Sequence, residues 1–331
     1  MQLTTQIPQQ SQATKRGTNK AAKVLVLGGN GFIGRYTTAV LARYGVTTTV
    51  GTRRVKHAET ERQVKLHKAL SEQAWEETLK EFDAVINTVG ILRERKNESF
   101  DQVHHLAVGA LARACKKRDI PLLHMSALGI DQLSNEFAAS KRRGEAAILN
   151  SGCRGAIVRA SIVNALDGYG ASWMYRVATW PVWLLPGKAT KLLCPIEAKD
   201  LGEALANLTV MHLQNRSGQT KVIEIGGPEV FTLKTYLRKL RAQQDCLPVK
   251  PFLTIRIPNV IVRLFAKMFD ELHLTPYSVG HHELLELDNT PHQNSLAKIL
   301  ERKPTEVGKT PDEFPVLLKN ELKIIGASLM R

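Results

Sequence analysis

The chain has 331 residues, 43% of them hydrophobic, so it can bury a full core and is not disordered overall. Lysine and arginine number 46 against 31 acidic residues, and the net charge of +15 favours an anionic ligand or surface. The basic residues are scattered and not interleaved with aromatics, which disfavours nucleic acid relative to a phosphorylated cofactor or an acidic membrane surface. The four cysteines form no Cys-x-x-Cys pair, so the pattern predicts neither a zinc site nor a disulfide framework and fits a reducing compartment.

The N-terminal stretch and the hydropathy pattern bear on location. Residues 1–22 are rich in Gln, Thr and Ser and lack the apolar core of a secretory signal, so we expect a flexible tail. A mitochondrial presequence is the less favoured interpretation, because too few arginines line one helical face. No run reaches the roughly 20 uncharged apolar residues of a transmembrane helix, so we expect no transmembrane segment.

A glycine-rich turn follows the first buried-strand pattern, Val24–Leu27, and precedes a helix-forming stretch. Its three glycines, spaced three apart, permit a tight turn, a close approach of the backbone to a diphosphate, and close packing of helix on strand. The helix N-terminus then faces the phosphates. We therefore expect a nicotinamide dinucleotide to contact Gly28, Gly29, Asn30, Gly31, Phe32, Ile33 and Gly34.

Alternating apolar runs and helical patterns predict a doubly wound parallel sheet, the Rossmann architecture, over residues 23–166. From about residue 167, Trp, Pro and Gly punctuate the chain, which predicts a small C-terminal α/β substrate lobe over 167–331, interleaved with the Rossmann domain. Helices are expected at 199–212 and 233–244. Strands are expected at 24–27, 47–51, 64–67 (a weak third), 84–87, 122–126, 155–159 and 221–225.

Two positions after predicted strands indicate the cofactor's identity. NAD-selective proteins usually place an acid after the second strand, but here Arg53 and Arg54 follow it. Guanidinium groups would bind an adenosine 2′-phosphate, so NADP(H) is favoured over NAD(H); a solvated basic loop is the alternative. After the fourth strand, Val89 and Gly90 would let the chain pass beside the cofactor's ribose and nicotinamide.

The assembled motifs resemble those of the extended and atypical short-chain dehydrogenase/reductases, over most of residues 23 to about 315. Those closest in character are similar to the nucleotide-binding accessory subunit of respiratory complex I. The matching strings are residues 28–35 (GGNGFIGR), 83–95 (DAVINTVGILRER), 124–129 (HMSALG), 140–145 (SKRRGE) and 225–228 (IGGP).

The resemblance implies a catalytic serine, tyrosine and lysine, which would fall at Ser126, Phe137 and Lys141. Phenylalanine cannot exchange a proton, so general acid/base catalysis worth roughly two to four powers of ten is lost. Lys141 can still bind the ribose hydroxyls, or it is a surface lysine in a basic run. Ser126 can orient a carbonyl, or it satisfies a backbone group. Of Ser140, His124 and Tyr169 as replacement acids, spacing singles out none.

Two functions remain open. The first is an NAD(P)(H)-binding accessory or sensing protein in a respiratory or quinone-linked assembly, with a respiratory-complex or membrane-surface partner. The second is an active NADP-dependent oxidoreductase or sugar-nucleotide epimerase/dehydratase that uses another proton donor. The expected location is the cytoplasm, with attachment to the inner membrane as an alternative, or the mitochondrial matrix in a eukaryote.

Three further segments carry alternatives. Residues 173–185 hold three of the four tryptophans and predict either a pocket lid or docking surface, or core packing. Residues 252–269 mix apolar and basic residues, which suits a surface helix, either an ordinary one or one lying on an anionic bilayer. The histidine pairs at 104–105 and 281–282 lack a third residue at metal-ligand spacing, so no metal is expected.

Overall fold

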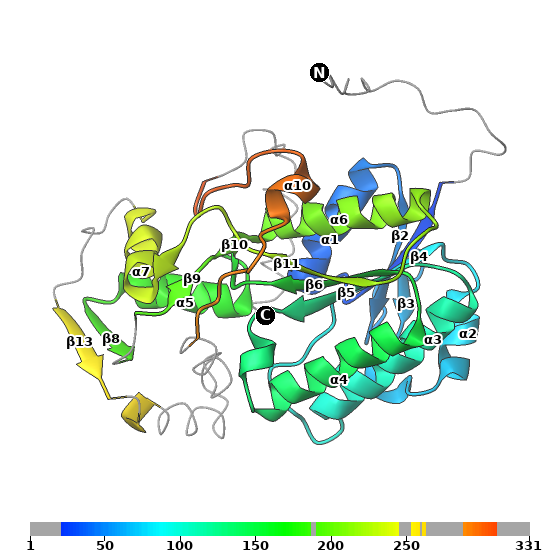
Figure 1. Cartoon of the computed structure of the whole chain (residues 1–331), viewed down its shortest axis with the longest axis horizontal. Helices are drawn as coiled ribbons and strands as arrows, with labels where there is room; N and C mark the ends of the chain where they lie inside the picture. Colours follow the sequence, from blue (N-terminus) through cyan, green and yellow to red (C-terminus); the bar gives the residue numbers. More distant parts are fainter. Residues whose placement is uncertain (1–20, 187–189, 245–252, 259, 263–286, 310–331) are drawn as a thin grey trace, which may run out of the picture.

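The computed structural model describes residues 21–186, 190–244, 253–258, 260–262 and 287–309, and their centre is a parallel seven-stranded sheet between two helical layers (Figure 1). The strand order β11-β6-β5-β4-β1-β2-β3 runs outward in both directions from β1 and β4. The prediction of a doubly wound parallel sheet is therefore confirmed. The sheet strands are β1 Lys23–Leu27, β2 Thr47–Thr52, β3 Glu61–Gln63, β4 Ala84–Asn87, β5 Leu122–Ala127, β6 Gly155–Ala160 and β11 Lys221–Ile225.

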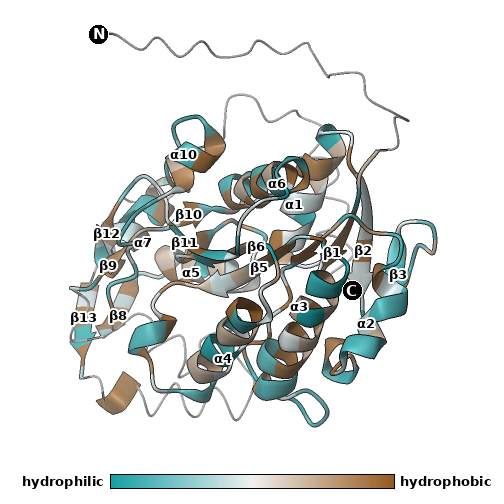
Figure 2. Ribbon diagram, turned by 45° about the vertical axis from the view of Figure 1, so that its right-hand side comes forward, coloured by the Kyte–Doolittle hydropathy of each residue, from teal (hydrophilic) through white to brown (hydrophobic). Residues whose placement is uncertain are grey.

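Side chains alternate between the two faces of this sheet, and each face buries a separate apolar cluster. Leu25 and Leu27 point to the layer of α2, α3 and α4, whereas Val24 and Val26 point to the layer of α1 and α6. The strands are accordingly the brown centre of the hydropathy view (Figure 2). The helices of the two layers are α1 Phe32–Arg43, α2 Glu72–Leu79, α3 Ala107–Lys117, α4 Glu136–Ser151 and α6 Ala198–Gln214. Short helices join the elements on the α2–α4 side: η1 Leu66–Lys68, the π-helix η2 Asp101–Leu106 and η3 Ile130–Gln132.

The predicted third strand was wrong in position. Residues 64–67 were expected to form it, but β3 ends at Gln63 and η1 begins at Leu66. As the edge strand, β3 pairs with β2 alone, so its exposed residues are polar. The apolar Val64 and Leu66 are buried because they pack into the core from the connection that follows the strand.

The C-terminal half contributes to both the sheet and a small lobe. Strand β11 and helix α6 belong to the sheet and its layer, whereas a third apolar cluster, which includes Trp183 and Tyr236, forms the lobe. The predicted helices at 199–212 and 233–244 correspond to α6 and α7. The remaining elements are β7 Val163–Asn164, α5 Tyr169–Thr179, β8 Val182–Pro186, β9 Leu192–Leu193, β10 Ile196–Glu197, β12 Phe231–Thr232, α7 Leu233–Ala242, β13 Leu253–Ile257 and α10 Leu296–Leu300.

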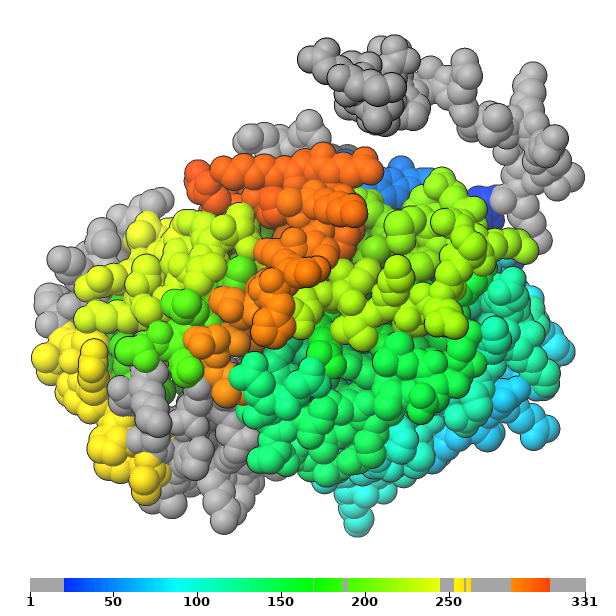
Figure 3. All heavy atoms as spheres, in the orientation of Figure 1, coloured from blue at the N-terminus to red at the C-terminus, as the bar shows by residue number. Residues whose placement is uncertain are grey.

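Strand β13 and the tryptophans bear on two predictions for this half. The expected surface helix at 252–269 is wrong at its start, because Leu253–Ile257 is strand β13, which pairs in parallel with β8; residues 263–286 lie outside the described residues. Trp183 is fully buried and supports core packing, although Trp180 is 41% exposed. The segment 287–309, orange in Figure 3, crosses the surface between the lobe and α6. It anchors there through Thr305, whose N–H and hydroxyl both donate to the Asp200 carboxylate.

Candidate dinucleotide site

The turn between β1 and α1 requires glycine at three positions. Gly28 has φ +77°, and a Cβ there would lie 2.9 Å from Thr88 Oγ1. A Cβ on Gly31 would lie 2.9 Å from the Gly28 carbonyl oxygen, and one on Gly34 would overlap that same oxygen. Only glycines allow α1 to start this close to β1.

The first turn of α1 has the features of an anion-binding helix N-terminus. Its N-cap is Gly31, which has no side chain to cap the free N–H groups, and no acidic residue lies in the first turn. The side chain of Phe32 packs over Gly168, and that of Ile33 packs against the cluster under α6. These side chains point away into the protein, so only the backbone N–H groups of this turn can face a diphosphate.

A stacked cation holds the start of α1 to the chain after β7. The Arg35 guanidinium lies 5.5 Å from the Phe32 ring centroid and 5.4 Å from that of Tyr36. The same guanidinium is 2.6 Å from Asp167 Oδ2, and the Tyr36 hydroxyl donates to Asp167 Oδ1 at 2.8 Å. Burial, with the Asp167 charge nearby, raises the pKa of the Tyr36 hydroxyl well above its ordinary value. The first turn of α1 is thereby fixed from its outer side.

The two arginines after β2 differ in their contacts. The Arg53 side chain is 61% exposed, and its Nη1 lies 3.3 Å from Glu98 Oε2. Glu98 Oε1 also lies 3.3 Å from His67 Nδ1. Arg54 is exposed, and its carbonyl accepts from the Thr52 hydroxyl at 3.2 Å. Sequence reasoning missed Glu98, because it lies 45 residues beyond Arg53 in the chain.

An acid missed by the sequence analysis lies beside the turn. Glu61 Oε1 accepts from the Asn30 side chain at 2.7 Å, and its Oε2 accepts from the N–H groups of Lys56 and His57. The bond from the Lys56 N–H is the main cause of the lowered pKa of Glu61. This carboxylate is therefore ionised and occupied, and it closes the loop after β2 against the glycine turn.

A buried hydrogen-bond chain sets the path of the chain after β4. The Asn87 side chain accepts from the Val89 N–H at 3.1 Å and lies 3.2 Å from His124 Nδ1. His104 Nε2 accepts from the Ile91 N–H at 3.0 Å, and its Nδ1 lies 3.1 Å from the Ser140 hydroxyl.

Because the Ser140 hydroxyl donates to the Phe137 carbonyl, His104 Nδ1 must carry the proton. Burial lowers the pKa of His104 to about 2 and that of His124 to about 3, so both rings are neutral. The protons of His104 and Ser140 are thus already donated within the protein, whereas His124 accepts from Asn87 at Nδ1 and carries its proton on Nε2.

Lys141 lies in this same buried region. It is only 7% exposed, so its interpretation as a surface lysine is wrong. The ammonium is 5.7 Å from the Phe137 ring centroid, and a Cβ on Gly90 would lie 3.9 Å from it. Burial lowers the pKa of Lys141 to about 8, and within the described residues no carboxylate forms an ion pair with it. The nearby Glu145 is bound by Arg159, with Oε2 2.5 Å from Nη2.

Phe137 lies one helical turn before Lys141 on α4 and is half-buried. Its ring makes edge contacts with Phe100 at 5.8 Å and His104 at 5.5 Å between centroids. Ser126 lies at the end of β5 and is 3% exposed, and its hydroxyl finds no partner among the described residues. An orphaned buried hydroxyl and an unpaired buried ammonium are the groups that a ribose or carbonyl oxygen would satisfy.

The lobe contains a second polar cluster that the sequence analysis did not single out. Glu197 Oε1 accepts from Asn164 Nδ2 at 2.7 Å and from the Gly308 N–H at 2.8 Å, and the Tyr236 hydroxyl donates to Asn164 Oδ1 at 2.7 Å. Burial raises the pKa of Glu197 to about 7. The bonded residues of this cluster are 33 to 111 positions apart in the chain, so the sequence gives no common signal for them.

The described residues hold neither a metal cluster nor a membrane-spanning helix. Throughout the described ranges, no group of three His, Cys, Asp or Glu side chains could hold a metal, and the pair at 281–282 lies outside those ranges. Within the same ranges no helix has the length and hydropathy needed to cross a bilayer. Cys115, Cys153 and Cys194 are buried free thiols, whereas Cys246 lies outside the described residues.

Known proteins are similar to this chain in sequence over its N-terminal half and beyond. Residues 24–172 match the NAD dependent epimerase/dehydratase family, which supports binding of a nicotinamide dinucleotide. The mitochondrial NADH-ubiquinone oxidoreductase 40 kDa subunit of Neurospora crassa is 27% identical over 220 residues, 62% of this chain and 56% of the relative. Subunit 9 of the NADH dehydrogenase [ubiquinone] 1 alpha subcomplex of Arabidopsis thaliana, also mitochondrial, is 27% identical over 222 residues, 62% and 54% of the two chains. The chain thus spans just over half the length of these relatives.

Solved structures show the same fold. An NADPH-dependent quinone oxidoreductase from Escherichia coli, complexed with NADPH, superposes with a TM-score of 0.63 at 15% identity, covering 86% of this chain and 96% of the other. MoeE5 in complex with UDP-glucose and NAD gives 0.59 at 16% identity, covering 86% and 94%. Family match and relatives agree with the motifs: the chain is similar to the NAD dependent epimerase/dehydratase family over residues 24–172 and to mitochondrial subunits of NADH-ubiquinone oxidoreductase, and it has the same fold as the solved structures.

Proposed function

We propose that this chain is a dinucleotide-binding accessory or sensing protein of a respiratory or quinone-linked assembly, and that it does not catalyse hydride transfer. One observation carries the proposal: the ammonium of Lys141 faces the ring of Phe137, where a catalytic tyrosine would present a hydroxyl. Residues that bind the cofactor are retained, whereas the residue that would move a proton is absent. Loss of that general acid alone removes roughly two to four powers of ten in rate.

The proposed cofactor contacts follow from the geometry. The diphosphate lies against the backbone of residues 28–34, and the nicotinamide ribose takes hydrogen bonds from the Lys141 ammonium beside Val89 and Gly90. Ser126 then orients a carbonyl group. NADP(H) is preferred to NAD(H), because Arg53 and Arg54 follow β2 and the nearby acid Glu61 is already occupied.

The proposed location and organisation draw on the relatives' names. Two relatives are mitochondrial subunits of NADH-ubiquinone oxidoreductase, so we place this chain in the mitochondrial matrix beside such an assembly. Residues 23–166 would carry the cofactor, and residues 167–331 would supply a lobe that contacts a partner. Residues 1–22, proposed as a tail, lie almost entirely outside the described part of the chain.

A second candidate is an active oxidoreductase or sugar-nucleotide epimerase/dehydratase. The buried Ser126 hydroxyl without a partner favours it, since such a group suits a substrate carbonyl. The hydrogen bonds of His104 and Ser140 oppose it, because the protons of these two side chains are already donated within the protein.

Calorimetry and turnover separate these functions. We expect the purified protein to bind NADPH with submillimolar affinity and to oxidise it with no quinone, carbonyl or sugar-nucleotide substrate. Arg53→Asp should weaken NADPH roughly tenfold to a hundredfold, the value of a charged hydrogen bond, and NADH far less. Arg216→Asp, an exposed site, is the matched control. Substrate-dependent turnover would overturn the accessory role, and equal losses of both dinucleotides would overturn the assignment of Arg53.

A further inference from the structure

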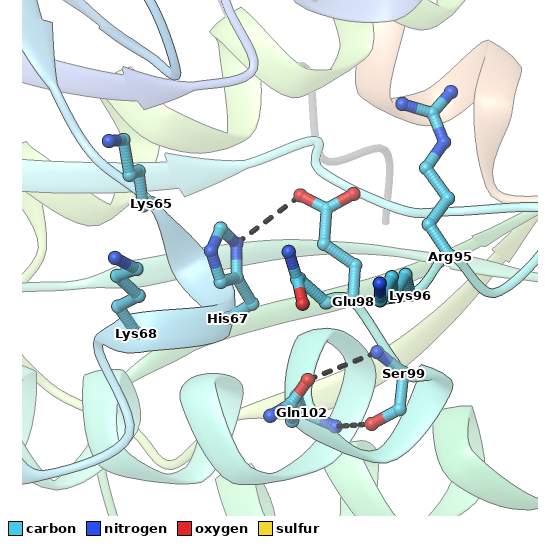
Figure 4. Close-up of a pocket in the computed structure, with 9 residues that line it drawn as sticks. Lys65, His67, Lys68, Arg95, Lys96, Glu98, Ser99 and Gln102 are labelled. Atoms are coloured by element: carbon cyan, nitrogen blue, oxygen red, sulfur yellow. Dashed lines mark hydrogen bonds and ion pairs between the residues drawn. The ribbon is translucent and has the colours of Figure 1, made fainter.

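A basic pocket is lined in part by Glu98, the acid that pairs with Arg53. It has a volume of about 860 Å³ and opens between the η1 region and the hairpin after β4 (Figure 4). Lys65, His67 and Lys68 line one wall, and Arg95, Lys96 and Glu98 line the other. No motif in the sequence analysis singled out this combination, because the two walls are some 30 positions apart in the chain.

The charges around the pocket are unbalanced. Lys65, Lys68, Arg95 and Lys96 are exposed, and no described carboxylate pairs with any of them. Glu98 is the one acid among the residues that line the pocket, and both its oxygens are engaged, by Arg53 and His67. Four unpaired cations around one cavity create a positive potential that attracts an anion.

The wall that carries Arg95 and Lys96 is held in place before any ligand binds. The N–H and carbonyl groups of Arg95 and Glu98 exchange two hydrogen bonds of 2.9 Å, which close a tight turn. Ser99 and Gln102 then exchange a reciprocal pair, each backbone N–H donating to the other's side chain at 3.1 Å, as Figure 4 shows. This arrangement is a capping box, and it fixes the start of the helix beneath the pocket.

We propose that this pocket binds a phosphate monoester, which competes with Glu98 for Arg53. A dianion matches several converging lysine charges better than a monovalent carboxylate does, since lysine binds phosphate as a point charge. The phosphate has two sources: the 2′-phosphate of NADP(H), which rests on the proposed function, or a separate phosphorylated molecule. Glu98 sets the affinity, because its carboxylate occupies Arg53 until the phosphate displaces it.

The test neutralises one wall at a time. Lys65→Gln/Lys68→Gln and Arg95→Gln/Lys96→Gln should each weaken binding of the phosphate-bearing probe roughly fivefold to tenfold, as expected for two exposed charges. Glu98→Gln should strengthen it by a similar factor, because the competing charge is lost. Lys221→Gln/Lys298→Gln, two exposed lysines elsewhere, is the matched control and should change nothing. The probes are NADPH, NADH and inorganic phosphate, measured by calorimetry at low and high salt.

The outcomes separate the two sources from failure. Weaker NADPH binding with NADH unchanged supports the 2′-phosphate as the occupant. Weaker phosphate binding with NADPH unchanged supports a separate phosphorylated ligand. Unchanged affinities for all probes in both wall variants, or a loss in Glu98→Gln, overturn the pocket. A wild-type protein that binds phosphate here but neither dinucleotide would refute the proposed function and leave the pocket standing; one that binds neither phosphate nor NADPH overturns both.

Discussion

Replacing Lys141 with methionine should stabilise the protein and lower its affinity for the dinucleotide. Methionine keeps the length of the side chain inside α4 and removes only the charge. The ammonium is buried without an ion pair among the described residues, so the folded state bears a desolvation penalty whenever it is charged. A ligand that hydrogen-bonds to the ammonium would offset this penalty. The variant therefore tests whether Lys141 serves a ligand or the fold.

The size of the effect follows from the pKa. Burial lowers the pKa of Lys141 from the ordinary 10.5 to about 8, and each pKa unit corresponds to about 1.4 kcal/mol, so the charge costs about 3 kcal/mol at pH 7. The lost contact with the Phe137 ring is worth about 0.5–2 kcal/mol in the opposite direction. We expect a net gain of about 1–3 kcal/mol in the free energy of unfolding.

The pH dependence identifies the cause. The penalty is complete below the folded pKa of about 8, shrinks as pH rises, and is gone above the unfolded pKa of 10.5, where lysine is neutral in both states. Urea unfolding of wild type and Lys141→Met should therefore differ most at pH 7 and converge near pH 10.5. Lys298→Met, an exposed site, should stay within about 0.5 kcal/mol of wild type.

Binding provides the second readout. Loss of a charged hydrogen bond to the ribose should raise the Kd for NADPH and NADH alike, roughly tenfold to a hundredfold. A variant that unfolds more easily at pH 7 would show that the ammonium stabilises the fold through Phe137. An unchanged Kd in a stable variant would show that Lys141 does not contact the dinucleotide.

Three other substitutions test separate parts of the site. Phe137→Tyr should give a phenol with a pKa below its ordinary value, because the Lys141 ammonium lies next to the ring. Absorbance titration measures this pKa, and an ordinary value would place the hydroxyl away from Lys141. Gly34→Ala should abolish dinucleotide binding and lower the free energy of unfolding by about 1–3 kcal/mol, because its Cβ overlaps the Gly28 carbonyl. Gly170→Ala, with open space around it, is the control. Normal calorimetric binding by Gly34→Ala would refute the packing argument. Glu197→Gln should raise the free energy of unfolding by up to about 3 kcal/mol above pH 7 and should not change it below pH 4.5. The reason is that burial in the folded state raises the pKa of this carboxyl to about 7, so the wild-type protein must ionise a buried group as pH rises. A gain in urea unfolding that is independent of pH would contradict this cause.

The sheet could be predicted from the sequence wherever a strand carries apolar or β-branched residues of its own, in the five interior strands and in β11 at one edge. Strands β4 and β11 match the predicted bounds, and β1, β2, β5 and β6 differ by one residue at one end. Continuous apolar runs identify such strands directly. The edge strand β3 carries Glu61, Arg62 and Gln63, so its strand character depends on pairing with β2 and not on its own side chains. The same dependence on a partner explains why β13 was predicted as a helix.

The site was only partly predictable for a related reason. Glycine spacing and the absent tyrosine are local features, and the sequence displays both. The burial of Lys141 depends on η2 packing against α4, where a Cβ on Gly144 would overlap the His104 carbonyl. The pairing of Arg53 with Glu98 depends on a hairpin after β4. Contacts of this kind, between segments distant in the chain, leave no periodic pattern in the amino-acid sequence.

Helix α6 limits how the protein can be dissected. Its Leu201 and Leu205 belong to the same apolar cluster as Val24, Val26 and Ile86, and together with α1 this helix covers one side of the central sheet. A fragment that stops at residue 166 would expose the apolar side chains of those strands to solvent and would be prone to aggregate, although it contains the whole glycine-rich turn. Any experiment that seeks the cofactor-binding half by itself must carry α6 and β11 along with it.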